Sequence, residues 1–231
     1  MERLAVQPQL VDRVYAAILD AICAGRLAPG ERITQDGLAE TLAVSRQPVL
    51  QALLLLKKQG FVCDTGRRGL IVAPLDPRFV EHVYQVRGAL DGTAARGAAE
   101  QQAPDAATQG AVLIAAGREA ARARDVGRMI AADIDFHRFV YDLSGNPLIA
   151  EAASLHWQHI RRVMGGVLRS DRAARVWDEH AAILAAIVAG KPGEAEKQAR
   201  AHAEAAAKML ATELANQVPA SDGANGTRKS A

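Results

Sequence analysis

Apolar residues recur at helical spacing near the start of the chain. Between Leu10 and Ala24 they return every three or four positions, which predicts an amphipathic helix. The glycines and proline of segment 25–30 then end this helix. A second, short helix is expected from Thr34 to Leu42, with the Thr34 hydroxyl as its N-cap.

A third helix is predicted over residues 46–60. Ser45 is its expected N-cap, accepting a hydrogen bond from the amide of Gln47 or Val49, and Pro48 is tolerated in the first turn. Apolar residues that should face a core recur at helical spacing: Val49, Leu53 and Leu56. Arg46 and Gln47 then project from the exposed N-terminal end of the helix.

A hairpin is predicted after these helices. Residues 61–64 and 70–74 are apolar and strand-like, and the turn between them carries Arg67 and Arg68. Three helices followed by a basic hairpin indicate a winged helix-turn-helix. In that fold the third helix enters the major groove of double-stranded DNA, and the wing reaches a neighbouring groove or the backbone.

The rest of the chain has a helical pattern throughout. Helices are expected at 78–100, 105–124, 126–144, 147–165, 171–189 and 192–216. The predicted fold is therefore mainly α, with an N-terminal winged helix-turn-helix and a C-terminal antiparallel helical bundle. The expected divisions are a tail (1–9), the DNA-binding domain (10–75), a linker (76–78), the bundle (79–217) and a disordered tail (218–231).

Composition and charge agree with this division. Of 231 residues, 49% are hydrophobic and only 4% aromatic, which favours helices, and the net charge is +2. Segment 44–73 holds five basic residues and one acidic residue, which suits contact with nucleic acid but also an ordinary solvated face. The apolar runs are too short to cross a bilayer, so we expect a cytoplasmic protein with no membrane partner.

Four polar residues of the bundle have the spacing of a metal site. Asp133 and His137 lie four apart on one helix face, and His180 and His202 lie on two helices joined by a tight turn. One carboxylate and three imidazoles suit a divalent metal ion. Such an Asp–His pair is also common as a hydrogen-bonded helix pair, and buried histidines are often structural. Spacing alone leaves both interpretations open.

Catalytic motifs are missing from the sequence. It contains no His-Glu-x-x-His pattern, no nucleophile elbow and no glycine-rich phosphate loop. We therefore expect a protein that is not an enzyme, with no catalytic residues. A metal-dependent hydrolase remains the less favoured alternative, because a metal with an open position can activate water.

Residues 16–74 resemble the GntR family of bacterial transcription regulators through "GRLAPGERI", "LAETLAVSRQPVLQALLLLKKQGFV" and "GRRGLIV". Gln47 replaces the usual threonine of the family motif, and Leu50 replaces an arginine that normally contacts DNA. Gln47 can pair with adenine and Leu50 can touch a thymine methyl, so we expect an unusual half-site. The predicted DNA contacts are Arg32, Ser45, Arg46, Gln47, Leu50, Arg67, Arg68 and Gly69.

Residues 79–214, with "DIDFHRFVYDLSGNPLI", resemble the ligand-binding (FCD) domain of the FadR-type branch of this family. The resemblance implies that Asp133, His137, His180 and His202 bind a divalent metal, with zinc expected and nickel or manganese possible. It also implies a small carboxylate effector that completes the metal's coordination. Arg87 matches an effector-facing arginine of the branch, and Arg161 is a second candidate for pairing with the carboxylate.

The expected function is a ligand-responsive transcriptional repressor that binds a palindromic operator as a homodimer, because one head makes few base contacts. The alternative is a metal-responsive regulator without an organic effector.

Overall fold

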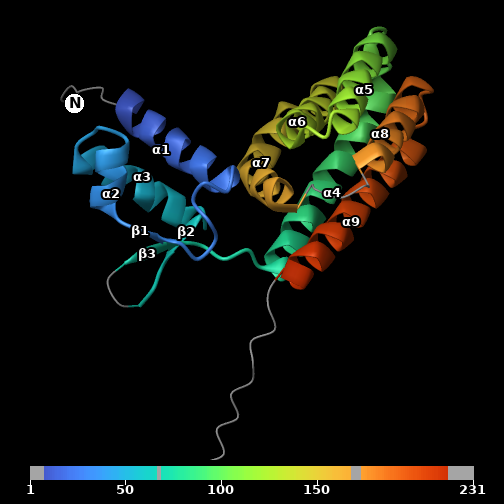
Figure 1. The fold of residues 1–231 in the computed structure, drawn as a ribbon. Helices are drawn as coiled ribbons and strands as arrows, with labels where there is room; N and C mark the ends of the chain where they lie inside the picture. Colours follow the sequence, from blue (N-terminus) through green and yellow to red (C-terminus); the bar gives the residue numbers. More distant parts are fainter. Residues whose placement is uncertain (1–7, 67–68, 168–172, 218–231) are drawn as a thin grey trace, which may run out of the picture.

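The protein is described by a computed structural model that covers residues 8–66, 69–167 and 173–217. Figure 1 shows a small N-terminal head beside a larger helical bundle. The head contains α1 (Pro8–Cys23), β1 (Arg32–Ile33), α2 (Gln35–Thr41), α3 (Arg46–Lys58), β2 (Val62–Asp64) and β3 (Leu70–Val72). The bundle contains α4 (Pro77–Gln101), α5 (Ala106–Arg122), α6 (Val126–Leu143), α7 (Pro147–Val167), α8 (Ala173–Val188) and α9 (Pro192–Gln217).

The head has a hydrophobic core of its own, separate from that of the bundle. α1 and α3 pack against each other, and Val49, Leu53 and Leu56 are buried as the helical spacing predicts. Thr34 caps α2 by accepting a hydrogen bond from the amide of Gly37 at 3.1 Å. The leucines thus hold α3 on the head and leave its N-terminal turn at the surface.

The wing differs from the predicted hairpin by one strand. It is a three-stranded antiparallel sheet in the order β1-β3-β2, in which Arg32 pairs with Ile71. The additional strand, β1, has only two residues, so its sequence is too short to show strand alternation. Its position makes Arg32 part of the wing, next to β3.

The N-cap of α3 also differs from the prediction. Ser45 lies at the N-cap with an extended backbone, but its hydroxyl makes no capping hydrogen bond. Instead, the side-chain amide of Gln35 donates to the carbonyl of Arg46 at 2.7 Å. α2 and α3 are therefore joined by a side chain of α2, while the Ser45 hydroxyl remains available at the surface.

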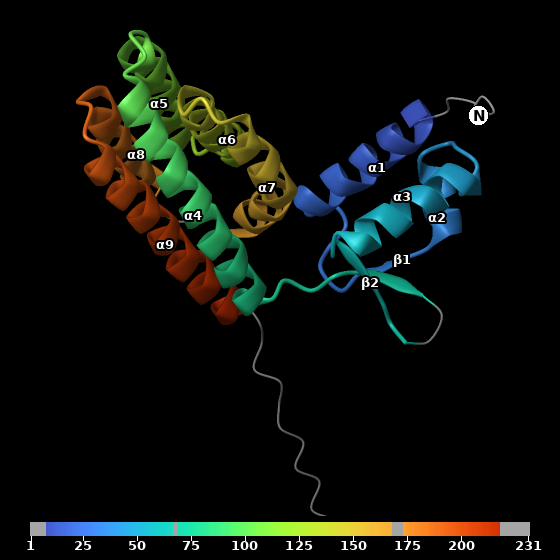
Figure 2. The ribbon, with the colours of Figure 1, turned by 180° about the vertical axis from the view of Figure 1, so that it is seen from behind.

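The bundle is built around α4, which packs against α6, α7, α8 and α9. α4 and α9 run antiparallel, side by side along most of their length (Figure 2). They approach closely because small residues face each other: a Cβ on Gly88 would lie 3.2 Å from that of Ala203. α4 begins at Pro77 with Asp76 as its N-cap, so two residues of the predicted linker belong to the helix.

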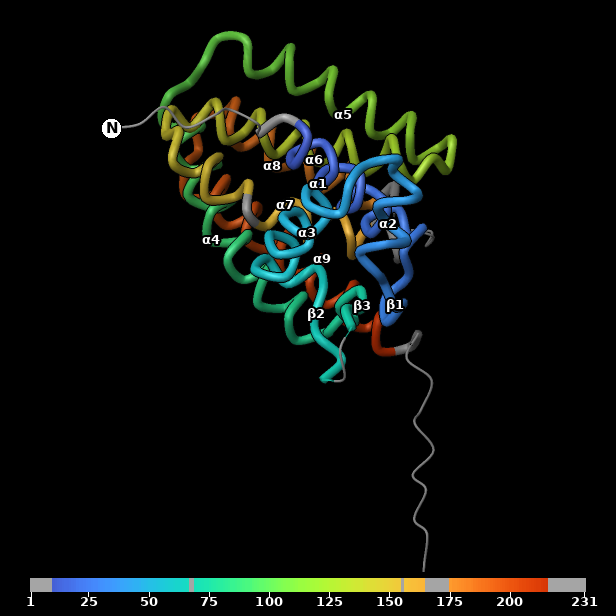
Figure 3. The backbone as a smooth tube through the Cα atoms, turned by 90° about the vertical axis from the view of Figure 1, so that its left-hand side faces the viewer, coloured from blue at the N-terminus to red at the C-terminus, as the bar shows by residue number. Residues whose placement is uncertain are grey.

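α7 is the bundle helix that contacts the head, which lies in front of the bundle in Figure 3. The ring of His159 stacks on Phe61 of the head, with centroids 4.2 Å apart. Arg161 pairs with Asp20 of α1 at 2.5 Å, and the Arg162 guanidinium donates to the carbonyl of Ala73. One helix of the bundle thus makes stacking, ionic and hydrogen-bonding contacts with the head.

Across the three described ranges, no helix combines the length and apolar character needed to span a membrane.

Candidate functional site

The N-terminal turn of α3 presents polar side chains to solvent. The Arg46 side chain is 72% exposed, and its Nε lies 2.7 Å from a carboxylate oxygen of Asp36. Because both groups are exposed, this ion pair is weak and can exchange for a phosphate or a base. Gln47 and Ser45 beside it are exposed as well.

Two further predicted DNA contacts lie near this turn and the wing. Leu50 is 40% exposed, one helical turn after Arg46, so an apolar side chain stands on the outer face of α3. The Arg32 side chain lies over Gly69, where an added Cβ would be 3.5 Å from the Arg32 Nε atom. Arg67 and Arg68, at the predicted wing tip, lie outside the described residues.

In the bundle, the four predicted metal ligands converge. Asp133 and His137 come from α6, His180 from α8 and His202 from α9, and all four are buried. Each offers one ligand atom, and these atoms all lie within 4.8 Å of one another. Among the described residues, this is the group of histidines and carboxylates that can surround a single metal ion.

Neighbouring carboxylates orient two of these histidines. His137 Nδ1 lies 3.3 Å from Asp91, and His202 Nδ1 lies 2.8 Å from Glu179. A carboxylate accepts only, so each Nδ1 carries the proton and each Nε2 keeps its lone pair. The Nε2 atom of His137 is buried without a hydrogen-bond partner among the described residues. Carboxylates of this kind commonly support histidines that bind metals.

Burial also keeps His180 and His137 neutral. It lowers the pKa of His180 well below the usual range, and His202, His137 and Arg87 lower it further. Burial, followed by the charge of Arg87, lowers the pKa of His137 as well. A neutral imidazole is the form that ligates a metal.

Arg87 connects the cluster to α4. Its Nε lies 3.3 Å from Asp91 and its Nη2 lies 3.2 Å from Asp133, with all three side chains buried. Asp91 also accepts a hydrogen bond from Tyr141 at 2.5 Å. Burial would raise the pKa of Asp91, but His137 and Arg87 outweigh burial and hold that pKa well below its usual range. Arg87 thus lies between two buried carboxyl groups, Asp91 and Asp133.

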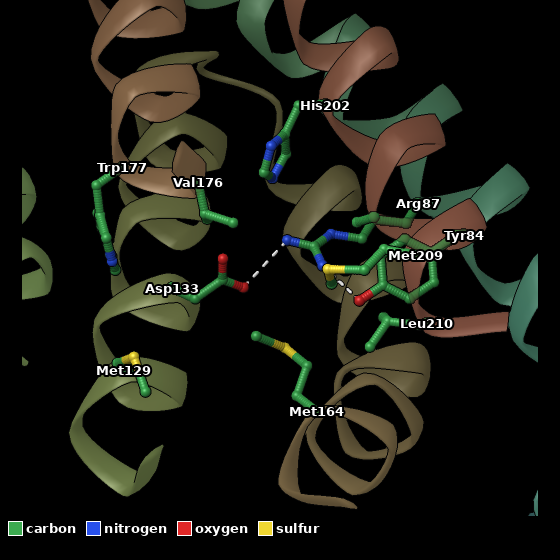
Figure 4. Close-up of a pocket in the computed structure, with 11 residues that line it drawn as sticks. Tyr84, Arg87, Met129, Asp133, Met164, Val176, Trp177, His202, Met209 and Leu210 are labelled. Carbon is green, nitrogen blue, oxygen red and sulfur yellow. Dashed lines mark hydrogen bonds and ion pairs between the residues drawn. The ribbon is translucent and has the colours of Figure 1, made fainter. Parts of the chain in front are cut away.

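A cavity of about 40 Å³ adjoins these groups (Figure 4). Arg87, Asp133 and His202 form its polar end. The remaining wall is mainly apolar and comprises Met129, Met164, Val176, Trp177, Ala206, Met209 and Leu210, together with Tyr84. A small molecule in this cavity would lie against a metal ligand at one end and hydrocarbon at the other.

The structure does not bring Arg161 to this cavity. Its guanidinium lies at the head, paired with Asp20, whereas Trp157 of the same helix contacts Arg87. The Arg87 guanidinium lies over the Trp157 ring, 4.7 Å from the centroid, and His137 lies 5.6 Å from the same ring. Arg161 is therefore omitted from the effector site, and its contact with Asp20 joins the bundle to the head.

Sequence reasoning missed Asp91 and Glu179 as partners of the cluster histidines. Asp91 had a local signal, because it follows Arg87 by four residues on the same helix face. Glu179 directly precedes His180, but its contact with His202 joins two helices and carries no sequence pattern. The sequence also showed no sign that Met129, Met164 and Met209 line one cavity, because they come together only when α6, α7 and α9 pack.

The head has the fold of a DNA-binding domain and the cluster lies in a separate helical domain, and comparison with known proteins agrees with this division. The profile described as "Bacterial regulatory proteins, gntR family" matches residues 10–72, and the profile described as "FCD domain" matches residues 82–205. A regulator from the TAR-I ttuE-ttuC' intergenic region of Agrobacterium vitis is 34% identical over 134 residues. That match covers 55% of this chain and 76% of the relative. The Nta operon transcriptional regulator of Aminobacter aminovorans is 34% identical over 120 residues, covering 51% of this chain and 56% of that protein.

Solved structures share the fold. E. coli McbR/YncC superposes with a TM-score of 0.73 at 20% identity, covering 88% of this chain and 97% of that one. A GntR regulator from Rhodococcus sp. RHA1 gives a TM-score of 0.70 at 23% identity, covering 87% and 97%. The chain belongs to the GntR family, with an FCD domain, and is a DNA-binding transcriptional regulator of this type. The resemblance and the fold class predicted from the sequence are confirmed.

Proposed function

We propose that this regulator is a repressor whose operator binding is controlled by a small carboxylate bound at a metal ion in the bundle. Asp133, His137, His180 and His202 would hold the metal, and Arg87 would pair with the effector. The observation that carries the proposal is the unpartnered, buried Nε2 of His137, which is directed into a cluster of ligand atoms within 4.8 Å of one another.

The donor set fits a divalent ion of the zinc, nickel or manganese class. Without a metal, two buried carboxylates face one buried arginine, which leaves one negative charge uncompensated in a low-dielectric site. A bound divalent cation removes this deficit and, when bound, supplies a Lewis-acidic position for a carboxylate oxygen. Arg87 uses three of its five N–H groups on described partners, so two remain for that carboxylate.

DNA reading is assigned to the exposed side chains of the head. Arg46 and Gln47 would contact bases in the major groove, and Leu50 would contact a thymine methyl. Ser45 and Arg32 would contact the backbone, together with Arg67, Arg68 and Gly69 at the wing. Because one head reads few bases, the repressor would act as a homodimer on a palindromic duplex.

α7 offers a physical route between the two sites. Trp157 lies against Arg87 and His137, while His159, two residues later, stacks on Phe61 of the head. A shift of Trp157 on effector binding would move the same helix that holds the head. The effector would then favour one of two head arrangements, which is how a ligand changes operator affinity.

The test begins with an operator selected from random duplexes and metal-stripped full-length protein. Zinc is titrated in while operator affinity is followed by fluorescence anisotropy, and small carboxylates are then added. The proposal predicts one tightly bound zinc per chain and a carboxylate that changes operator affinity by roughly 5–150-fold, the usual range of allosteric coupling.

Other outcomes distinguish the alternatives. An operator response to zinc with no response to any carboxylate would favour the metal-responsive regulator. Failure to bind zinc, nickel or manganese would contradict the proposal, since the cluster would then be a hydrogen-bonded core. The same titration on His180→Ala shows whether the metal occupies this cluster.

A further inference from the structure

A cleft of about 390 Å³ lies where the head meets the bundle. Its head side is formed by α1, the end of α3 and Phe61, and its bundle side by α4 and α7. This volume is within the range of about 300–1,000 Å³ that small-molecule sites occupy, and such sites are common at domain interfaces. The cleft shares no lining residue with the buried cluster or with the cavity beside it.

We propose that this junction cleft is a second small-molecule site, which binds an uncharged aromatic molecule between the head and the bundle. The inference does not depend on a metal in the cluster. Three features of the cleft support it: an apolar stripe of α4 that stays exposed, aromatic rings contributed by both domains, and the lack of charged groups among the described residues of its wall.

The apolar stripe lies at the start of α4. Phe79, Val83 and Val86 recur at helical spacing, and all three line the cleft. Val83 is buried, but Phe79 is 42% exposed and Val86 is 43% exposed. Large apolar side chains that gather in a hollow and remain in contact with water favour a ligand-binding surface. A bound ring would remove this stripe from water.

Aromatic rings line the cleft from both domains. Phe61 of the head stacks on His159 of α7, with centroids 4.2 Å apart and planes 4° apart. Phe79 of α4 meets the same imidazole edge-on at 4.8 Å, and Tyr15 of α1 forms part of the head wall. Aromatic rings pair by offset stacking or by edge-to-face contact, and this wall offers partners for both. These rings favour a flat aromatic ligand over an aliphatic one.

Charge selects further. Among the described residues that line the cleft there is no Asp, Glu, Lys or Arg. Burial lowers the pKa of His159 to about 4, so its ring is neutral at about pH 7. A charged ligand would lose its water without gaining an ion partner. The amide oxygens of Gln59 and Gln158 accept hydrogen bonds from Tyr15 and Arg161, which leaves amide N–H groups for a polar, uncharged substituent.

The position of the cleft gives its ligand a regulatory effect. Because the head and the bundle each contribute a wall, a bound molecule contacts both domains. It therefore favours the arrangement of the two domains in this structure over any arrangement that opens the cleft. Operator affinity should respond to such a ligand, which gives the regulator an input separate from the buried cluster.

The experiment is a calorimetric titration of metal-stripped, full-length protein at about pH 8, above the ordinary histidine pKa of about 6.5. Three probes share one indole ring and differ in charge: indole-3-acetamide is neutral, indole-3-acetate is negative and tryptamine is positive. Phenylacetamide is a second neutral probe with a smaller ring. Indole-3-acetamide should bind at least about tenfold more tightly than either charged indole, the factor that corresponds to ~1.4 kcal/mol for a desolvated group without a partner.

A charge introduced into the cleft tests the location. Val86 lines the cleft, whereas Val112, which is 65% exposed on α5, does not. Val86→Glu should reverse the preference, so that tryptamine binds more tightly than indole-3-acetamide, because the new carboxylate supplies an ion partner. Val112→Glu is the matched control and should leave the order of the probes unchanged. A gain of tryptamine binding is a result that misfolding does not produce.

The aromatic wall is tested separately. Phe79→Leu keeps an apolar side chain but removes a ring, so it should weaken binding of indole-3-acetamide by roughly 2–12-fold, the usual value of an aromatic pair. Saturating the native protein with indole-3-acetamide should change operator affinity by at least about 5-fold, as measured by fluorescence anisotropy.

Each part of the inference has a result that would overturn it. Binding of indole-3-acetate or tryptamine as tight as that of indole-3-acetamide would refute the uncharged class, and failure of both amides to bind would refute the aromatic site. A reversed preference in Val112→Glu would refute the location. Unchanged operator affinity at saturation would refute control of the head. None of these results bears on the metal-held carboxylate, because the protein is metal-stripped throughout.

Discussion

The head and the bundle place their functional polar residues in opposite environments. Arg46 of the head is 72% exposed, and its partner Asp36 is 65% exposed. Arg87 of the bundle is 3% exposed and lies between two buried carboxylates. One arginine therefore has a weak, exchangeable partner, whereas the other is part of a fixed network.

Because of this difference, stability and function are related differently in the head and in the bundle. A DNA-reading side chain must leave its own partner for a phosphate or base, so a weak ion pair at the surface is an advantage. A metal or effector site must keep its ligands oriented in the free protein, so buried carboxylates hold His137 and His202. Substitutions in the head should therefore impair binding alone, and substitutions in the cluster should impair stability as well.

The largest effect is expected at Arg87. Arg87→Met leaves Asp91 and Asp133 buried without their cation, which should cost about 3–5 kcal/mol in the free energy of unfolding of the metal-free protein. Urea unfolding measures this value. Arg96 on the same helix is the matched control, because it pairs with Glu196 but is 52% exposed. Arg96→Met should cost less than about 1 kcal/mol, and equal losses would refute the contrast.

Zinc should produce the next largest effect. A metal that binds only the folded protein, at a free concentration 100 times its Kd, stabilises by about 2.7 kcal/mol. The native protein should show this increase in its free energy of unfolding, and His180→Ala should show almost none. His82→Ala is the control, because His82 is exposed on α4 and lies away from the cluster. A zinc response that persists in His180→Ala would place the metal elsewhere.

Arg46→Ala should weaken operator binding by about 1–3 kcal/mol and relax base specificity at one position. The free energy of unfolding should change by less than about 0.5 kcal/mol, because the side chain is exposed. Lys58→Ala, in the last turn of the same helix, should have a smaller effect on operator affinity. Unchanged binding by Arg46→Ala, measured by fluorescence anisotropy, would refute the assignment of α3 as the reading helix.

The smallest expected effect lies where the two regions meet. Burial lowers the pKa of His159 to about 4, with Arg162 and His156 also lowering it and a hydrogen bond with the Gln59 backbone opposing them. Between the ordinary histidine pKa, about 6.5, and pH 4, the unfolded chain binds more protons than the folded chain at this position. Stability should therefore fall as the pH falls through this window, as measured by urea unfolding.

His159→Phe is the variant that isolates this contribution, because phenylalanine can keep the stacking on Phe61 but does not titrate. Its free energy of unfolding should fall less between pH 6.5 and pH 4 than that of the native protein. Identical pH dependence in both proteins would show that His159 does not contribute.

The sequence predicted the helices well because their signals are local. The apolar spacing of Val49, Leu53 and Leu56 places α3, and the Asp133–His137 spacing places two ligands on one face of α6. The tight turn between α8 and α9 predicted that His180 and His202 could meet, and their Nε2 atoms lie 3.2 Å apart.

The remaining contacts were not predictable because they join distant segments. Arg161 reaches Asp20 across 141 positions of the chain, and no periodicity indicates that α7 meets α1. The strand β1 has two residues and depends on β3 for its hydrogen bonds. The cavity wall depends on how the bundle helices pack, which apolar spacing constrains only to a face.

The central claim is that occupancy of the buried cluster controls the exposed reading surface. The most direct measurement is the operator affinity of zinc-loaded protein across a titration with the carboxylate that the anisotropy screen identifies, for the native chain and for His180→Ala. The account predicts that this carboxylate weakens operator binding by at least about 5-fold in the native protein, the lower end of typical coupling, and has no effect in His180→Ala. The same response to the carboxylate in both proteins would contradict the account, since control of the head would then bypass the cluster.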